Sequence, residues 1–234
     1  MCAESEQRAT SFFRRMRQIY AIQVQAEERI NKHLATGFNV VQQFIQPNEE
    51  KLSAIFAWLL DPRGSHGQGA TFFNLFFSAK RKIDVSSLLS VKTEVVTSHI
   101  DRSQRRIDIV LEGKDWIVGM ENKPWAFEQY NQLMDYQRQL HAQNKVHKYL
   151  YYLPGNVGGY TSDSKELEDE CPIITLPYRQ IGGEGSIEAW LEQSIQLCQA
   201  EKVRFFLSGL LAYVRQEFNN FEGNAEGITN GEGV

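Results

Sequence analysis

The sequence has few cysteines, no long apolar run and no leader-like start, and each absence excludes a class of protein. Three cysteines among 234 residues are too few and too scattered for a disulfide framework or a zinc knuckle. No stretch approaches the roughly 18 consecutive apolar residues of a membrane span. The N-terminus lacks the basic-then-apolar order of a secretory signal. We therefore expect a protein of the reducing cytoplasm with no membrane partner.

Short motifs of several enzyme classes are also missing. The sequence contains no GxxxxGK[ST] phosphate loop, no HExxH zinc helix, no GxSxG nucleophile and no paired CxxC. The sequence therefore gives little support for an enzyme of any of those classes.

Basic residues are slightly fewer than acidic ones, 25 against 29, and they are unevenly distributed. The net charge is −4, of which the last stretch, Glu222 to Val234, contributes −3. Four arginines and no acidic residue lie between Arg8 and Ala26. Between Lys80 and Arg106 the sequence has seven basic and three acidic residues. Such local excess is compatible with phosphate binding, although the solvated faces of ordinary helices and loops account for either cluster equally well.

Apolar periodicity divides the chain into helices and strands. Asn48 is a suitable N-cap for a helix that Asp61-Pro62 ends. The order of elements predicts an α/β fold with a mixed sheet covered by helices on both faces. Residues 1–221 are expected to form one domain, and the Gly- and Asn-rich residues 222–234 a flexible tail. Within the domain we expect a helical extension (1–44), a core (45–180) and C-terminal helices (181–221). Helices are predicted at 5–34, 49–60, 70–80, 126–143, 186–200 and 201–218, and strands at 91–97, 105–112, 115–122, 147–154 and 171–177.

Two of the predicted strands carry charged residues at positions where their hydrophobic pattern predicts apolar ones. Asp108 sits between two isoleucines, and Glu121 and Lys123 share one face of the next strand with Gly119. Charges in half-buried strands are costly unless they are paired, hydrogen-bonded or metal-bound. We predict that Gly119 is small because something lies over that face.

Whether Asp108 joins the other two charges depends on the hairpin register. A two-residue loop at Gly113-Lys114 places Asp108 opposite Gly119 and within reach of Glu121, whereas a three-residue loop over 113–115 places it opposite Met120, on the wrong face. A functional interpretation therefore requires an even loop or a bulge.

Two acids and a lysine on one sheet face suit the binding of a hard cation. Mg²⁺ is commonly held by one or two carboxylates, several waters and substrate phosphate, and the backbone carbonyl of Asn122 would be a further ligand. A lysine beside the bound water can orient it or stabilise developing charge. The competing interpretation is a structural ion network, with Arg105 and Arg106 neutralising Asp108. The short spacing alone favours that alternative.

The pattern of Ile107-Asp108 followed by Glu121-Asn122-Lys123 resembles the PD-(D/E)XK nuclease superfamily. Ile107 replaces the proline of the motif, and Pro124 directly follows the lysine. One branch of the superfamily also begins with a helical NE…S…I…LLDP…HG pattern and has a later helix with Glu, Gln-Leu and Tyr. The matching residues, within about 45–155, are Asn48-Glu49, Ser53, Ile55, Leu59-Leu60-Asp61-Pro62, His66-Gly67, Glu128, Gln132-Leu133 and Tyr136.

This resemblance implies a restriction-endonuclease-like αβββαβ core and phosphodiester hydrolysis dependent on Mg²⁺ or Mn²⁺. It implies that Asp108, Glu121 and the Asn122 carbonyl bind the metal and that Lys123 activates or positions water. Glu49 would support the metal, with Glu50 as its substitute. Gln132 and Tyr136 would hold the ligands in place, and Glu94 is a further outer candidate. The alternatives are a dipole-stabilised Glu49, amphipathic packing of Gln132 and Tyr136, and an exposed Glu94 paired with Lys92 or Arg106.

The expected substrate is nucleic acid, with DNA favoured over RNA, cut by an endo- or exonuclease in restriction, anti-phage defence or a mobile element. His66 would either contact phosphate or order its loop by a hydrogen bond. A second copy of the chain and a partner protein of a defence system are kept open. The alternative function is a catalytically inactive nucleic-acid- or protein-binding module on a nuclease fold. The candidate nucleic-acid-binding residues are His66, Lys80, Lys82, Arg102, Arg105 and Arg106.

Overall fold

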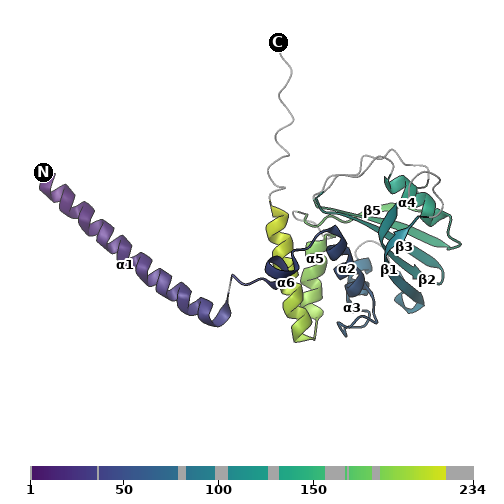
Figure 1. Ribbon diagram of the computed structural model, residues 1–234, viewed down its shortest axis with the longest axis horizontal. Coiled ribbons are helices and arrows are strands. Elements are labelled where there is room, and N and C mark those ends of the chain that lie inside the picture. The colour runs from purple at the N-terminus through teal and green to yellow at the C-terminus, as the bar shows by residue number, and fades with distance from the viewer. Residues whose placement is uncertain are drawn as a thin grey trace, which may run out of the picture. The chain divides into compact units, whose positions relative to one another are not determined.

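The computed structural model describes residues 2–35, 37–78, 83–97, 105–125, 132–155, 167, 169–180 and 185–219. The chain divides into two compact units, residues 1–39 and 40–234. Figure 1 shows a long helix in the first unit and a sheet with several helices in the second. The single domain expected over 1–221 stays a prediction, and the expected tail lies outside the described residues. No helix in the described ranges is long and apolar enough to cross a membrane.

The first unit is built on one long helix, α1 (Cys2–Leu34), which begins three residues before the predicted start. Lys32 and His33 lie in its last turn, where positive charge interacts favourably with the helix dipole. Ala35 follows in the left-handed conformation, with φ of 44°, and its N–H donates to Asn31 O. The predicted helix is confirmed.

The second unit contains five strands and five α-helices among its described residues. The helices are α2 (Glu49–Leu60), α3 (Thr71–Ser78), α4 (Gln132–His141), α5 (Ile187–Leu197) and α6 (Glu201–Glu217). The strands are β1 (Leu88–Val96), β2 (Arg106–Gly113), β3 (Trp116–Lys123), β4 (His147–Pro154) and β5 (Ile173–Thr175). A π-helical turn, η1 (Val41–Ile45), and a 3₁₀ turn, η2 (Val85–Ser87), were not predicted.

Helix α2 forms where the sequence predicted it, because both of its ends are specified locally. The Asn48 side chain accepts a hydrogen bond from the Lys51 N–H at 2.9 Å. The helix ends before Pro62, at Asp61, whose backbone is extended. Its buried face includes Leu52, Phe56 and Leu60.

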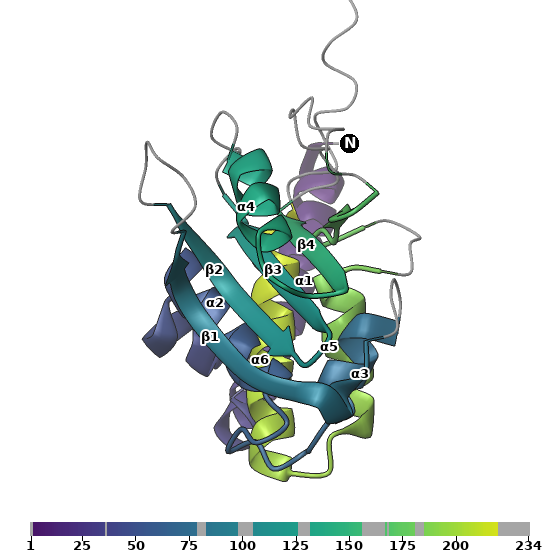
Figure 2. The same cartoon turned by 90° about the vertical axis from the view of Figure 1, so that its right-hand side faces the viewer.

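The sheet is mixed, with strands in the order β1-β2-β3-β4-β5. The first three strands form an antiparallel meander, and β4 and β5 extend it in parallel. In Figure 2 the sheet is seen with α4 in front of it and the helices of the other layer behind. The succession of α2, three meandering strands, α4 and β4 confirms the predicted αβββαβ core.

Two apolar cores lie on the two faces of this sheet. The larger core joins one face to α2, α3, α5 and α6 and is rich in aromatic side chains such as Phe72, Phe76 and Trp190. The smaller core joins the other face to α4 through Leu133, Tyr136 and Leu140. Helical layers on both faces, as predicted, leave the ends of the strands as the places where polar groups can gather.

The β2–β3 hairpin has the even loop that the functional interpretation required, one residue later than predicted. Ile109 pairs with Met120 and Glu112 with Ile117, so the turn lies at Lys114-Asp115 and Gly113 is the last residue of β2. The indole of Trp116 covers Gly113: a Cβ there would lie 2.2 Å from a ring carbon. Trp116 Nε1 donates to Asp84 O and to Ser87 Oγ. This anchored ring explains the register.

Candidate active site

Asp108 and Glu121 lie on neighbouring strands at the end of the hairpin away from the turn. Continuing the pairing of Ile109 with Met120 by one residue places Asp108 directly opposite Glu121. Asp108 Oδ2 accepts a hydrogen bond of 2.6 Å from the backbone N–H of Asn122. The two carboxylates predicted to converge are therefore cross-strand neighbours, and one of them is fixed to the strand of the other.

Gly119 shows what covers this face of the sheet. A Cβ at Gly119 would lie 2.9 Å from Leu140 Cδ1 and 3.4 Å from Ile107 Cγ2. The prediction that this glycine is small because something lies over it is confirmed, and the covering group is α4. The close approach brings the helix down onto the strand that carries Glu121.

Lys123 bridges two carboxylates from different elements. Its Nζ lies 3.1 Å from Glu49 Oε2, at the start of α2, and 3.3 Å from Glu121 Oε1. The lysine side chain is only 14% exposed. The structure thus brings Glu49 to the site, as predicted, whereas Glu50 in the same turn is exposed to solvent.

Helix α4 supplies a chain of hydrogen bonds to Glu121. Gln132 Nε2 donates to Glu121 Oε1 at 2.7 Å and to Tyr136 Oη at 2.9 Å. The Tyr136 hydroxyl donates in turn to Arg106 O at 2.6 Å. These two side chains, predicted one helical turn apart on one face, meet over the acidic group rather than only packing against the sheet.

Burial dominates the electrostatics of the site. Burial raises the pKa of Asp108 to about 6, against the lowering effects of the Asn122 hydrogen bond and Lys123. Burial and then the charge of Asp108 raise the pKa of Glu121 to about 8. Burial alone would lower the pKa of Lys123, but Glu121 and Glu49 outweigh it and the pKa is raised. The site therefore holds acidic groups whose charge the surrounding protein compensates only in part.

One oxygen in particular fits a bound cation. Glu121 is 1% exposed, and its Oε2 is buried without a hydrogen-bond partner in the described part of the chain. A buried carboxylate oxygen left in this way is costly unless a cation or water approaches it. Within the described ranges no three His, Cys, Asp or Glu side chains form a complete metal-binding cluster. Two carboxylates completed by carbonyl and water oxygens are the kind of shell that Mg²⁺ accepts.

Asn122 has a second role that sequence reasoning missed. Its fully buried side chain projects to the opposite face, where Nδ2 donates to Ser53 Oγ at 3.0 Å and to Glu49 O at 3.3 Å. Its Oδ1 accepts from the Tyr178 hydroxyl at 2.8 Å. This side chain fixes the start of α2 to β3, and so fixes Glu49 beside Lys123. Strand alternation alone would place the Asn122 side chain on the face opposite Glu121 and Lys123, but nothing in the local sequence indicates Tyr178 as its partner.

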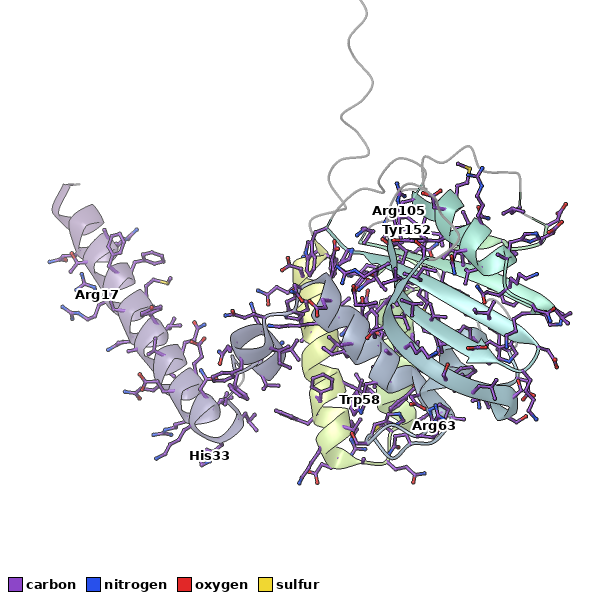
Figure 3. The ribbon with its side chains drawn as sticks, turned by 45° about the vertical axis from the view of Figure 1, so that its right-hand side comes forward. Arg17, His33, Trp58, Arg63, Arg105 and Tyr152 are labelled. Atoms are coloured by element: carbon purple, nitrogen blue, oxygen red, sulfur yellow. The ribbon has the colours of Figure 1, made fainter. Side chains whose placement is uncertain are left out.

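The arginines next to β2 pair with acids other than Asp108. Arg105, labelled in Figure 3, has its Nε 3.3 Å from Asp135 Oδ2 of α4. Arg106 Nε lies 3.4 Å from Glu94 Oε2. Among the described residues, these ion pairs join the two arginines to Asp135 and Glu94 rather than to Asp108. Glu94 has a φ of 53°, a strained value in a strand, and its charge contributes to raising the pKa of Asp108. Its ion pair with Arg106 is the alternative that the sequence offered.

His66 is buried in its loop, and both of its ring nitrogens have protein partners. It is 1% exposed, its Nδ1 accepts from the Gln68 N–H at 3.0 Å, and its Nε2 lies 2.9 Å from Asp61 O. The ring also packs against Trp58 and Phe72. Its predicted role in nucleic-acid binding is corrected: with both nitrogens engaged, His66 orders its loop. The candidates Lys80, Lys82 and Arg102 lie outside the described residues.

Comparison with known proteins gives one match. A family model described as the PD-(D/E)XK nuclease superfamily matches residues 36–215, which is most of the chain and nearly all of the described second unit. No curated protein and no solved structure matches significantly. The matched range includes Glu49, Asp108, Glu121 and Lys123.

Proposed function

Because this chain belongs to the PD-(D/E)XK nuclease superfamily, we propose that it hydrolyses phosphodiester bonds of nucleic acid, with DNA as the favoured substrate and Mg²⁺ or Mn²⁺ as the cofactor. Superfamily membership supports a hydrolytic nuclease. The residues and the cofactor are inferred from the site, and the preference for DNA is inferred from family analogy.

The observation that carries the proposal is the state of Glu121. It is buried beside Asp108, and its Oε2 is left without a donor in the described part of the protein. A purely structural ion network would be expected to satisfy that oxygen, because a buried, half-satisfied polar network is worse for stability than an apolar core. A metal ion shared by the two carboxylates removes the cost.

Asp108, Glu121 and the backbone carbonyl of Asn122 would hold the cation. When bound, a divalent metal polarises the phosphate and lowers the pKa of a coordinated water. Lys123 would donate a hydrogen bond to the attacking water or to a phosphate oxygen, because its ammonium is already held between Glu49 and Glu121. Gln132 would keep Glu121 oriented through its 2.7 Å hydrogen bond.

The overall reaction adds water across an ester bond. The water oxygen bonds to phosphorus, the P–O ester bond breaks, and the departing oxygen takes up a proton. Because phosphoryl transfer depends mainly on positioning and charge stabilisation, a lysine and buried carboxylates are adequate machinery for this chain to supply. We propose a setting in restriction or anti-phage defence on family analogy.

Two substitutions separate an enzyme from a binding module. Asp108→Asn keeps an acceptor for the Asn122 N–H but removes the charge, so we expect Mg²⁺ binding to weaken and cleavage to fall by about 10³-fold or more. Lys123→Met keeps the carboxylates, so Mg²⁺ binding should persist while cleavage is lost, since the ammonium acts mainly in the transition state. Mg²⁺ titration calorimetry and cleavage of plasmid, linear and single-stranded substrates measure both effects.

Glu50→Gln is the matched control, because Glu50 neighbours Glu49 but is exposed. It should cut like the wild type, whereas Glu49→Gln should cut more slowly. If the folded wild type cuts no nucleic acid with Mg²⁺ or Mn²⁺, and Asp108→Asn binds nucleic acid equally well, the inactive binding module is the correct function instead.

A further inference from the structure

Helix α1 has a broad apolar face that is exposed. Eight large apolar side chains along the helix are each between 50% and 70% exposed. A helix with such a stripe normally buries it against another element, because exposed apolar area of this size marks an interaction surface. These residues are Phe12, Phe13, Met16, Ile19, Tyr20, Ile22, Ile30 and Leu34.

The face follows the period of a coiled coil. Alternating steps of three and four residues run from Ala9 to His33. In this heptad register Phe13, Tyr20 and Leu34 flank the seam at e positions, so the apolar face continues beside it. The a positions are Ala9, Met16, Gln23 and Ile30, and the d positions are Phe12, Ile19, Ala26 and His33.

We propose that α1 pairs with α1 of a second copy of this chain as a parallel two-stranded coiled coil. The proposal concerns an interaction surface in residues 2–34 and does not depend on the nuclease activity. It assigns this face one occupant, which is the same face of an identical helix.

The area available matches what such an interface needs. A large side chain exposed by more than half offers roughly 100 Å² of surface. Eight of them offer roughly 800 Å² per helix, which is about what each partner contributes to a standard-size interface. The helix is also long enough, since the 25 residues from Ala9 to His33 extend for about 36 Å.

The charged residues beside the seam favour the parallel orientation. Arg8, Arg15 and Arg29 occupy three of the four g positions, and Ile22 occupies the fourth. In an antiparallel pair g faces g, which would place arginines of the two helices against each other. In a parallel pair g faces the next e position, so Arg15 lies over Tyr20 of the second copy, where a cation–π contact is favourable.

Gln23 supports the same orientation. It is the only amide at the a and d positions, and its Nε2 donates within the helix to Glu27 Oε1 at 3.0 Å. In a parallel, in-register pair a faces a, so the Gln23 amides of the two copies meet and can hydrogen-bond to each other. In an antiparallel pair Gln23 would face Ile19 and leave its amide oxygen without a polar partner. A single polar a position is a known device for fixing register.

A lipid surface is the other occupant that this face could take, and the charge argues against it. Helix α1 carries six basic and four acidic residues, a net charge of +2. Membrane-surface helices concentrate Lys and Arg on the polar face and are attracted to anionic lipids in proportion to that charge. The acids at both ends of α1 oppose such attraction.

The first test measures the mass of the full-length protein in solution. Light scattering or sedimentation at about 1–100 µM should show a dimer for the wild type. Met16→Glu/Ile19→Glu puts two charges into the seam and should give a monomer. Gln18→Glu/Gln25→Glu adds the same charge at outer c positions and should stay dimeric. Circular dichroism checks that both variants fold.

A wild type that stays monomeric throughout this range overturns the proposal, as does a dimer that Met16→Glu/Ile19→Glu leaves intact. Co-sedimentation with phosphatidylserine–phosphatidylcholine vesicles is measured in parallel. A monomer that binds these vesicles through the Met16–Ile19 face would identify a lipid surface as the occupant and also overturn the proposal.

The second test fixes the orientation. His33→Cys is introduced into a Cys2→Ala background, because the other two cysteines, Cys171 and Cys198, are buried. In a parallel pair the two introduced thiols lie next to each other at a d position and should form a disulfide-linked dimer on mild oxidation. In an antiparallel pair they lie about 36 Å apart. A dimeric mass without cross-linking would overturn the parallel arrangement.

Discussion

At the scale of single residues, Glu121 is the group whose position most needs an explanation. One of its oxygens is surrounded by donors, with Gln132 Nε2 at 2.7 Å and Lys123 Nζ at 3.3 Å. The other oxygen is buried without a partner among the described residues. A carboxylate arranged in this way is oriented by the protein but not neutralised by it, which is the condition in which a metal ion adds most to stability and to chemistry.

Tyr178 offers a test of how the site is held together. Burial raises the pKa of its hydroxyl well above the ordinary value, so the group remains a proton donor to Asn122 Oδ1. Tyr178→Phe should lower the free energy of unfolding by about 1–3 kcal/mol, because Asn122 loses a buried partner. Urea unfolding measures the change.

Tyr213→Phe, which removes a tyrosine hydroxyl from α6, is the control. It should lower the free energy of unfolding by less than Tyr178→Phe does. In the Asn122→Ala background, Tyr178→Phe should cost little, since the acceptor is already gone. Equal costs in both backgrounds would show that the hydroxyl acts independently of Asn122.

At the scale of elements, the contact between α4 and β3 sets the site. Gly119 allows Leu140 to lie against the strand, and the same helix presents Gln132 to Glu121. The packing of Leu140 on Gly119 therefore controls the position of α4. Gln132, the residue of α4 that contacts Glu121, lies about two turns away from Leu140 along the helix. A change of packing at Gly119 should reach Glu121 through the position of this helix.

Gly119→Ala tests that link. The added methyl would lie 2.9 Å from Leu140 Cδ1, so we expect a loss of about 1–3 kcal/mol from overpacking. Leu140→Ala alone should also destabilise, by about 2–5 kcal/mol, because it leaves a cavity. In the double variant the methyl occupies part of that cavity, and Gly119→Ala should become neutral or stabilising. Thermal unfolding of the four proteins gives the coupling; strict additivity would mean that the two side chains do not meet.

At the scale of the whole second unit, a charged network ties α5 and α6 to the segment after β5. Glu188 accepts hydrogen bonds from Arg179 Nε at 2.8 Å and from Arg215 Nε at 2.7 Å, and Arg215 also pairs with Glu192. Burial alone would raise the pKa of Glu188, but these hydrogen bonds outweigh it and hold the pKa below its ordinary value. The network joins elements that are distant in sequence at one edge of the larger core.

This lowered pKa predicts a contribution to stability that depends on pH. A carboxyl group with a lower pKa in the folded state stabilises the fold above its unfolded pKa of about 4.5, and the stability is lost as the pH falls through the folded value. The melting temperature of the wild type should therefore fall more steeply below pH 4.5 than that of Glu188→Gln. Glu50→Gln, which changes an exposed glutamate, should retain the steep dependence. Parallel curves for the wild type and Glu188→Gln would exclude this contribution.

Local sequence determined the elements themselves and the types of residue at the site. The cap at Asn48, the break at Pro62 and the run of aromatic and apolar residues in β4 depend on neighbouring residues, so the bounds of these elements could be predicted. The pattern of Asp108 followed by Glu121 and Lys123, together with the motifs beside it, was sufficient to indicate the superfamily that the family model supports.

The tertiary structure decided what each charged group meets. The turn lies one residue later than predicted, so the residue opposite Asp108 is Glu121 rather than Gly119. The Trp116 ring, which packs over Gly113 and donates to Ser87, accounts for this shift, and that contact depends on η2 as well as on the hairpin. Arg105 pairs with Asp135 and Arg106 with Glu94, rather than with Asp108. The His66 ring packs against the aromatic ring of Phe72. Periodicity assigns a side chain to a face, but its partners come from elements distant in the chain, and burial fixes the strength of each interaction.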